Sequence, residues 1–195
     1  MHKFLPYKLY LAVQYASSAQ HVPTRAQLRR WIKIALLHEA SITLRIVDEP
    51  EGRELNKNFR GKDYATNVLT FVYDDAKATP QPPLSGGLIG SSPDLPPPDK
   101  GGMGGLGRPG GVAFQPLHGD LVICAPVVEQ EARDQRKDLL AHYAHLTLHA
   151  TLHLQGYLHE RDADAAEMET LESALMLKLR YPDPYLGSLS DNLAI

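Results

Sequence analysis

Three histidines near the carboxyl-terminal end of the chain have a spacing that can hold a metal ion. His149 and His153 are four residues apart, so on a helix they lie about 40° apart around the axis and about 6 Å apart along it. Gly156 permits the left-handed conformation that ends a helix, and the returning chain can bring His159 to the same ion. Three imidazoles with one open coordination position are typical of a catalytic zinc site, whereas a structural zinc is closed by four protein ligands. The spacing therefore predicts one Zn²⁺ per chain, bound by His149, His153 and His159.

The same spacing occurs in metal-dependent peptidases, whose motif reads His-x-x-x-His-x-x-Gly-x-x-His. Those enzymes carry a glutamate after the first histidine as general base, and this chain carries Ala150 there. The chain has 9 histidines, so one pair at helical spacing could be accidental, but the glycine and third histidine at the expected offsets favour a metal site. His145 and His142 extend the same helical face but are too far along the axis to reach the ion. We expect them to support the ligands or to line a cleft.

The composition is that of one soluble globular domain. Its 195 residues are 43% hydrophobic and 22% charged, which are ordinary proportions. The net charge is −3, so any binding of nucleic acid has to rest on a local basic patch. Cys124 is the single cysteine, which excludes an internal disulfide and fits a reducing compartment. No apolar run approaches the roughly 20 residues that span a bilayer, and the first residues lack signal-peptide features. We therefore expect a cytoplasmic protein with no membrane partner.

Hydrophobic periodicity predicts a single α+β domain, with a roughly four-stranded mixed sheet packed against about five helices. The long helix carries the histidine motif and is capped by Asp138, so the metal site is expected at the end of this helix. Asp48 is expected to cap an earlier helix. Strand patterns cover residues 9–15, 41–47, 68–73 and 120–124. Helix patterns cover residues 24–38, 51–59, 126–136, 138–153 and a last segment that begins at 162 or 164 and reaches 179.

Residues 74–117 differ from the rest of the chain in composition. They contain nine prolines and ten glycines among 44 residues. Such a segment has too little apolar area to offset the entropy lost on ordering, so we expect it to be disordered. It falls between the third and fourth predicted strands, as an insertion in a hairpin connection within a single domain of residues 1–195. A mobile insertion is the favoured interpretation, and a partner-binding arm is the alternative.

A group of cations lies at the end of the predicted helix 51–59. Arg60 has a planar guanidinium suited to a pair of phosphodiester oxygens, and Lys57 and Lys62 add positive charge beside it. By itself this signal is weak, because a charge cluster is usually a solvated surface.

Taken together, these segments resemble the YbeY family of bacterial rRNA-maturation endoribonucleases. The resemblance covers residues 55–71, 118–124 (HGDLVIC) and 144–159, and continues into the acidic stretch at 167–169. It implies a zinc-dependent hydrolase that prefers single-stranded RNA and acts on the 3′ end of 16S ribosomal RNA and in ribosome quality control. The expected partners are ribosomal RNA and the small ribosomal subunit, with no DNA. By position, the family's functional residues fall on Arg60 as the catalytic arginine and on His149, His153 and His159 as the metal ligands. Lys57 and Lys62, which add positive charge beside Arg60, are candidate RNA contacts.

The chain departs from the family pattern at two places in the histidine motif. Ala150 replaces a glycine, which a helix tolerates. Leu158 replaces an aspartate before the third histidine, which removes a carboxylate that could orient His159. Glu160 or Asp162 is expected to substitute for it.

Two other functions compete with RNA cleavage on the sequence alone. One is a zinc peptidase or amidase, against which the missing glutamate counts. The other is a non-catalytic ribosome-assembly factor in which zinc serves the structure, against which the open fourth coordination position counts. The sequence also leaves the nucleophile undecided between a metal hydroxide and the 2′-hydroxyl of the RNA.

Overall fold

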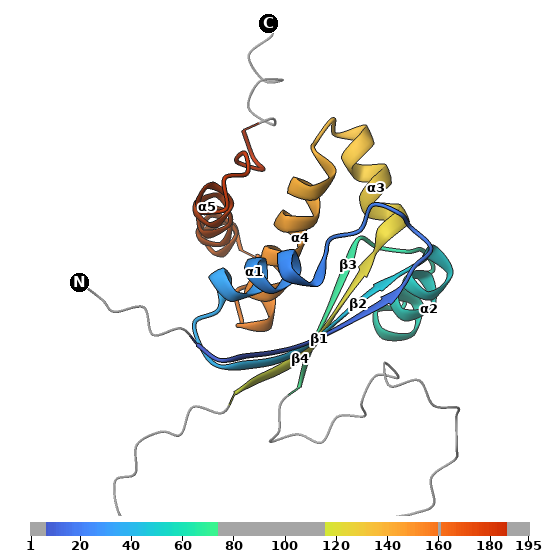
Figure 1. Ribbon diagram of the computed structural model, residues 1–195, viewed down its shortest axis with the longest axis horizontal. Helices are drawn as coiled ribbons and strands as arrows, with labels where there is room; N and C mark the ends of the chain where they lie inside the picture. The colour runs from blue at the N-terminus through green and yellow to red at the C-terminus, as the bar shows by residue number, and fades with distance from the viewer. Residues whose placement is uncertain (1–6, 74–115, 160, 187–195) are drawn as a thin grey trace, which may run out of the picture.

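The computed structural model describes residues 7–73, 116–159 and 161–186. Within these ranges four strands and five helices form one α+β unit, as the hydrophobic periodicity predicts (Figure 1). The strands are β1 (Leu9–Ala16), β2 (Ala40–Val47), β3 (Val68–Tyr73) and β4 (Leu117–Cys124). The helices are α1 (Arg25–Ala35), α2 (Glu49–Arg60), α3 (Ala125–Asp134), α4 (Leu139–Leu154) and α5 (Asp162–Lys178).

The four strands form one mixed sheet in the order β1-β2-β4-β3. β1 and β4 both run parallel to β2, and β3 runs antiparallel to β4. α1 makes the crossover that a parallel β1–β2 pair requires. β3 and β4 are antiparallel neighbours, and the residues that join them lie outside the described ranges. The mixed four-stranded sheet predicted from the sequence is therefore confirmed.

Alternate residues of β4 divide the core into two layers. Leu121 and Ile123 belong to a large apolar cluster with residues of α1, α4 and α5, whereas Val122 and Cys124 pack with Leu55 of α2. Figure 1 accordingly shows α1, α4 and α5 on one side of the sheet and α2 on the other. The first layer is the larger one, and it contains the helix that bears the histidines.

Helix α4 is buried over most of its length, which restricts how its polar residues can point. Eleven of its 16 residues are buried, including Tyr143, Leu148 and Ala150. Asp138 caps its first turn as expected, because the carboxylate accepts a hydrogen bond of 2.8 Å from the amide of Ala141. His145, His149 and His153, which are partly exposed, therefore lie on the narrow part of the helix surface that is not buried.

Two helix ends differ from the expected ones because of contacts that are distant in sequence. The helix predicted to reach residue 38 ends at Ala35. The side chain of Gln155 donates to the carbonyl of Ala35 at 2.9 Å and accepts from the amide of Leu37 at 2.7 Å. Gln155 thus satisfies the end of α1 and draws the following residues away from the helical path.

The expected cap at Asp48 is only partly correct. Asp48 occupies the position before α2, which begins at Glu49 rather than at residue 51, but its carboxylate accepts no hydrogen bond from that helix. It accepts hydrogen bonds instead from the hydroxyls of Ser17 and Ser18 and from the Ser18 amide. Asp48 therefore ties the end of β2 to the chain that follows β1.

The insertion predicted at 74–117 lies almost wholly outside the described residues, which resume at Pro116. Leu117, the last residue of the predicted insertion, is the first residue of β4. β4 is also longer than the predicted 120–124, because its first residues pair with both β2 and β3. None of the helices in the described ranges combines the length and apolarity needed to cross a bilayer.

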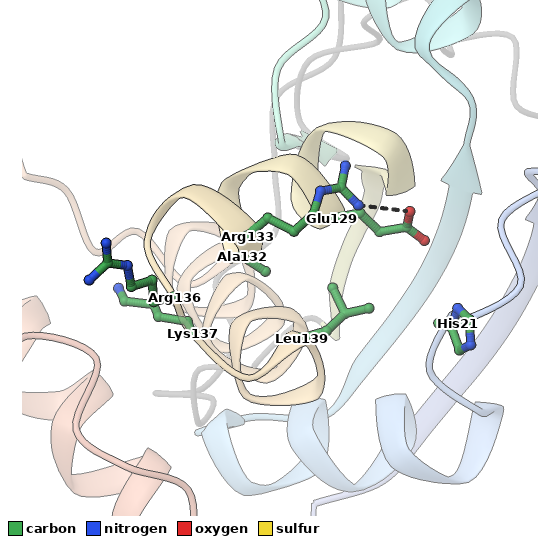
Figure 2. Close-up of a pocket in the computed structure, with 7 residues that line it drawn as sticks. All are labelled: His21, Glu129, Ala132, Arg133, Arg136, Lys137 and Leu139. Carbon is green, nitrogen blue, oxygen red and sulfur yellow. Dashed lines mark ion pairs between the residues drawn. The ribbon is translucent and has the colours of Figure 1, made fainter.

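The turn between α3 and α4 displays two cations. Arg136 adopts a φ of 53°, which is uncommon for a residue other than glycine. Its amide donates to the carbonyl of Arg133 at 3.1 Å, and the Lys137 amide donates to that of Ala132 at 2.9 Å. Figure 2 shows the side chains of Arg136 and Lys137 extending to the same side, away from the ion pair between Arg133 and Glu129.

Gly119 in β4 is expected to be essential for close packing of the sheet. A Cβ atom there would lie 2.5 Å from the backbone oxygen of Phe71 and 2.5 Å from Cδ2 of Leu154. The oxygen belongs to the sheet and cannot move away, so Gly119→Ala is expected to lower the free energy of unfolding by about 1–3 kcal/mol. Urea unfolding of the purified variant measures this loss.

Gly52→Ala is the matched control. Its added Cβ would meet the side-chain sulfur of Cys124 at 3.1 Å, a milder contact, and alanine has the better helix propensity by about 1 kcal/mol. A Gly119→Ala protein as stable as wild type would show that β3 and β4 can separate locally at no cost.

Candidate metal centre

The structure brings the three predicted ligands together at the carboxyl-terminal end of α4. His149 and His153 lie on its last turns, and His159 returns from the loop that follows. One nitrogen from each ring can be chosen so that all three lie within 4.8 Å of one another. The ring centroid of His159 is 5.6 Å from the ring centroid of His149 and 4.9 Å from that of His153. The three imidazoles thus surround a common point.

The loop that returns His159 depends on Gly156. This residue has a φ of 89°, in the left-handed region that glycine adopts without strain, as the motif predicts. The Gly156 amide donates to the carbonyl of His153 at 3.0 Å, and the Tyr157 amide donates to that of Leu152 at 3.2 Å. The helix therefore ends in a tight turn that reverses the chain toward its own last histidines.

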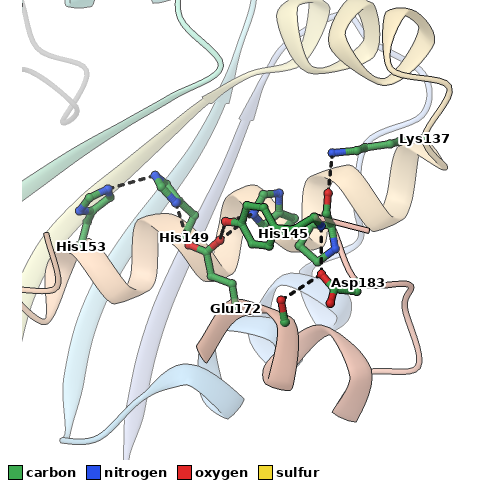
Figure 3. Close-up of polar contacts among 9 residues, drawn as sticks. Lys137, His145, His149, His153, Glu172 and Asp183 are labelled. Atoms are coloured by element: carbon green, nitrogen blue, oxygen red, sulfur yellow. Dashed lines mark hydrogen bonds and ion pairs between the residues drawn. The ribbon is translucent and has the colours of Figure 1, made fainter. Parts of the chain in front are cut away.

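The two helical ligands point their Nε2 atoms at each other (Figure 3). Nδ1 of His149 lies 2.8 Å from Oε1 of Glu172, and Nδ1 of His153 lies 2.8 Å from the carbonyl oxygen of Tyr157. A carboxylate and a carbonyl only accept hydrogen bonds, so each Nδ1 carries a proton, and in the neutral ring each Nε2 then carries a lone pair. The two Nε2 atoms are 3.0 Å apart. Two lone pairs at this distance repel unless a cation lies between them, so the arrangement fits a metal ion.

The donor set also fits zinc in size and protonation. Two nitrogens bound to a tetrahedral Zn²⁺ at about 2.0–2.1 Å are about 3.3 Å apart, close to the observed separation of the Nε2 atoms. Burial lowers the pKa of His153, and the charge of His149 lowers it further. The neutral form that binds metal is therefore favoured at neutral pH. No fourth histidine, cysteine or carboxylate joins the three within the described part of the chain.

Glu172 of α5 is the supporting residue that the sequence interpretation missed. It is fully buried and accepts hydrogen bonds from His149, from Nε2 of His145 at 2.7 Å and from the hydroxyl of Tyr185. Burial raises the pKa of this carboxyl, but the hydrogen bonds from His145 and His149 outweigh burial and hold the pKa at about 2. Glu172 is thus ionised and keeps the proton of His149 on Nδ1. An acidic residue on the apolar face formed by Met168, Leu175 and Met176 was the signal that could have identified it.

The other predicted supporting residues differ in where they lie. His145 bonds to Glu172, the carboxylate that also bonds His149, and its ring centroid is 6.3 Å from that of His149. His142 bonds to Glu131 of α3 at 2.9 Å and lines a pocket together with His145. Asp162 is exposed at the first position of α5 and makes no hydrogen bond with the cluster. Glu160 lies outside the described residues.

The structure does not bring Arg60 into contact with the histidines. Arg60 is the exposed last residue of α2, the helix on the opposite face of the sheet from α4, and it forms no ion pair or hydrogen bond among the described side chains. Lys57 pairs with Asp63 at 3.2 Å, and Lys62 is exposed. The ring of Phe59, 5.0 Å from that of Phe71, fixes this end of α2 against the edge strand β3.

Removing the charge of Glu172 tests its role in holding the metal. Glu172→Gln preserves the shape of the side chain but no longer stabilises the Nδ1–H form of His149. We expect zinc affinity to fall by about 10–100-fold, measured by competition with a chromogenic chelator. Glu169→Gln, at an exposed position on the same helix, is the control and should bind zinc as wild type does. Wild-type affinity in Glu172→Gln would show that His149 is oriented without the carboxylate.

Comparisons with known proteins show which family the chain belongs to. A family model described as Endoribonuclease YbeY matches residues 13–180. Proteins named endoribonuclease YbeY from Nitrosospira multiformis and Thiobacillus denitrificans are 51% and 46% identical over 183 and 178 residues. The first alignment covers 93% of this chain and 84% of the relative, and the second covers 91% and 97%. A third, from Nitrosomonas europaea, is 45% identical over 92% of this chain and 86% of its own length. On this match over most of its length, the chain belongs to the endoribonuclease YbeY family.

Proposed function

We propose that this protein is a zinc-dependent endoribonuclease that prefers single-stranded RNA and acts in maturation of the 3′ end of 16S ribosomal RNA and in ribosome quality control. The opposed Nε2 atoms of His149 and His153, with His159 beside them, carry this proposal. The names of the curated relatives support an RNA substrate. We place the activity in the cytoplasm on small-subunit ribosomal RNA, with no DNA or membrane partner.

Each candidate site residue has a separate role in the proposed reaction. His149, His153 and His159 hold the ion, and Glu172 and the Tyr157 carbonyl keep the two helical imidazoles in the binding tautomer. A bound zinc ion supplies Lewis acidity, which activates water near neutral pH and polarises a phosphoryl oxygen. Arg60 then offsets the negative charge that develops on the phosphate. Lys57 and Lys62 contribute positive potential along the RNA backbone.

A peptidase or amidase function is less well supported, because the position that carries the general base in those enzymes is buried in this protein. Ala150 is fully buried in the core of the sheet-facing layer. A glutamate there would lie among apolar side chains rather than beside the histidines. A purely structural zinc is less well supported because the described residues provide three donors and not four.

The direct test is cleavage of short oligonucleotides by the pure, metal-loaded protein. Single-stranded RNA from the 3′ end of 16S ribosomal RNA should be cut, whereas the same sequence as duplex RNA or as DNA should be cut slowly or not at all. A chelator should stop the reaction and Zn²⁺ should restore it. Masses of the products decide the nucleophile, since attack by the 2′-hydroxyl leaves a cyclic phosphate and attack by water does not. Cleavage that persists in the chelator would contradict the proposal.

A further inference from the structure

A pocket of about 270 Å³, lined by polar side chains together with Val68 and Leu146, lies along α4 directly beside the candidate metal centre. Its floor is formed by the α4 histidines 142, 145 and 149. The remaining walls come from the start of β3, from α3, from the α3–α4 turn and from the segment after α5. The residues that close these walls are Asn67, Glu131, Gln135, Lys137 and Tyr185. We refer to this space as the α3–α4 pocket.

The interior of the α3–α4 pocket is polar but its charges are compensated. The Asn67 amide donates to both oxygens of Glu131 at 3.1 Å, and His142 lies 2.9 Å from the same carboxylate. The charge of Glu172, behind His145 and His149, is likewise compensated by hydrogen bonds from these two histidines and from the Tyr185 hydroxyl. Such an interior suits a sugar or a base and rejects a phosphate.

The outer end of the pocket, at the α3–α4 turn, carries positive charge. Lys137 lines the pocket, and its ammonium donates to the neutral carbonyl of Pro184 at 3.1 Å (Figure 3). Arg136 precedes it in the chain and lines a neighbouring pocket that Lys137 also lines, and neither cation forms an ion pair within the described ranges. Both side chains extend from the turn in one direction (Figure 2). These two cations form a local attraction for an anion, although Glu131 compensates part of the charge of Lys137.

The two ends are separated by a distance that suits a short stretch of nucleic acid. Leu139 is the first residue of α4 and His149 follows ten residues later, which corresponds to about 15 Å along the helix. A strand whose cleavable phosphodiester lies at the histidines can therefore place its next nucleotide in the pocket and a further phosphate at the turn.

We propose that the α3–α4 pocket receives the nucleotide that adjoins the cleaved phosphodiester, and that Arg136 and Lys137 bind a backbone phosphate at its outer end. The inference rests on the proposed function, because it takes single-stranded RNA as the substrate. It assigns the strand a path along α4, from the histidines toward the α3–α4 turn. The base and ribose meet the neutral polar interior, and the phosphate meets the cations.

Arg136→Gly tests the phosphate contact without disturbing the fold, because glycine accepts the left-handed backbone at this position. Binding of a fluorescent single-stranded RNA octamer to metal-free protein is followed by anisotropy at several salt concentrations. The variant should bind more weakly at low salt, and the slope of log affinity against log salt should fall by roughly 0.7, the value for one lost phosphate contact. Arg30→Ala on α1, another exposed cation, should leave both affinity and slope unchanged.

Gln135→Trp tests the pocket itself. Gln135 is exposed at the end of α3 and lines the pocket, so an indole there should fill the space without unfolding the protein. KM for RNA cleavage should rise about tenfold, as for loss of one nucleotide contact, while zinc content stays at the wild-type level.

Each outcome separates this proposal from the function on which it rests. If wild type cuts RNA but both variants bind and cut it as wild type does, the path along α4 is wrong and the endoribonuclease function stands. If wild type neither binds nor cuts single-stranded RNA, both proposals fail. Tighter binding of an acidic peptide than of RNA would assign the cations to a protein partner and overturn the path.

Discussion

His153→Ala is expected to release the zinc and to slow RNA cleavage by on the order of 10³-fold, since Lewis acid catalysis contributes several kcal/mol to the barrier. His153 supplies one of the two Nε2 atoms that face each other at 3.0 Å, so its loss leaves His149 and His159 as an incomplete site. Elemental analysis of purified protein measures the zinc, and the rate on a single-stranded RNA measures the activity.

A matched histidine variant separates the loss of a ligand from a general loss of the fold. His21→Ala removes an exposed imidazole far from α4 in sequence and should retain about one zinc per chain. Circular dichroism should show the same helix content in both variants. Equal zinc in His153→Ala and wild type would refute the three-histidine site.

Arg60→Ala is expected to reduce cleavage by about 10²-fold while leaving the stability of the fold within about 0.5 kcal/mol of wild type. The small effect on stability follows from the structure, because Arg60 is exposed at the end of α2 and pairs with none of the described side chains. The large effect on rate is expected if its guanidinium meets the phosphate only in the complex with RNA. Thermal unfolding and single-turnover cleavage are measured on the same preparation.

Two further variants make the Arg60 result specific. Arg60→Lys keeps the charge but loses the planar pair of donors, so it should recover only part of the lost rate. Arg53→Ala removes another exposed arginine of α2, one that pairs with Asp63 at 2.8 Å, and should cut RNA at close to the wild-type rate. Unchanged cleavage in Arg60→Ala would remove this residue from the proposed mechanism.

Local patterns predicted the elements and the histidine cluster because the physics involved is local. The alternation of Ile42, Leu44 and Ile46 predicts β2, and all three side chains are buried in the observed strand. The cluster could be predicted for the same reason: a four-residue helical spacing, a glycine turn and a third histidine all lie within 11 residues of chain.

The missed features depend on contacts between segments that are distant in sequence. Glu172 comes from α5, and nothing near His149 in the sequence shows that this carboxylate will meet its Nδ1 atom. The end of α1 at Ala35 depends on Gln155, 120 residues later. Asp48 looked like a helix cap because its local context fits one, yet Ser17 and Ser18 compete successfully for its oxygens. Tertiary partners decided all three cases.

The carboxylate of Glu172 also determines the order in which this protein can fold and bind its metal ion. All three imidazoles are synthesised before α5, so they leave the ribosome before the residue that fixes the tautomer of His149. Strong metal uptake is therefore expected only after α5 has docked on α4. The coupling between docking and metal binding is reciprocal. An ion that binds only when α5 is docked on α4 stabilises the docked arrangement. Chelation should thus loosen the carboxyl-terminal helix before it affects the sheet, and hydrogen exchange with and without metal would show the difference in the amides of residues 168–178.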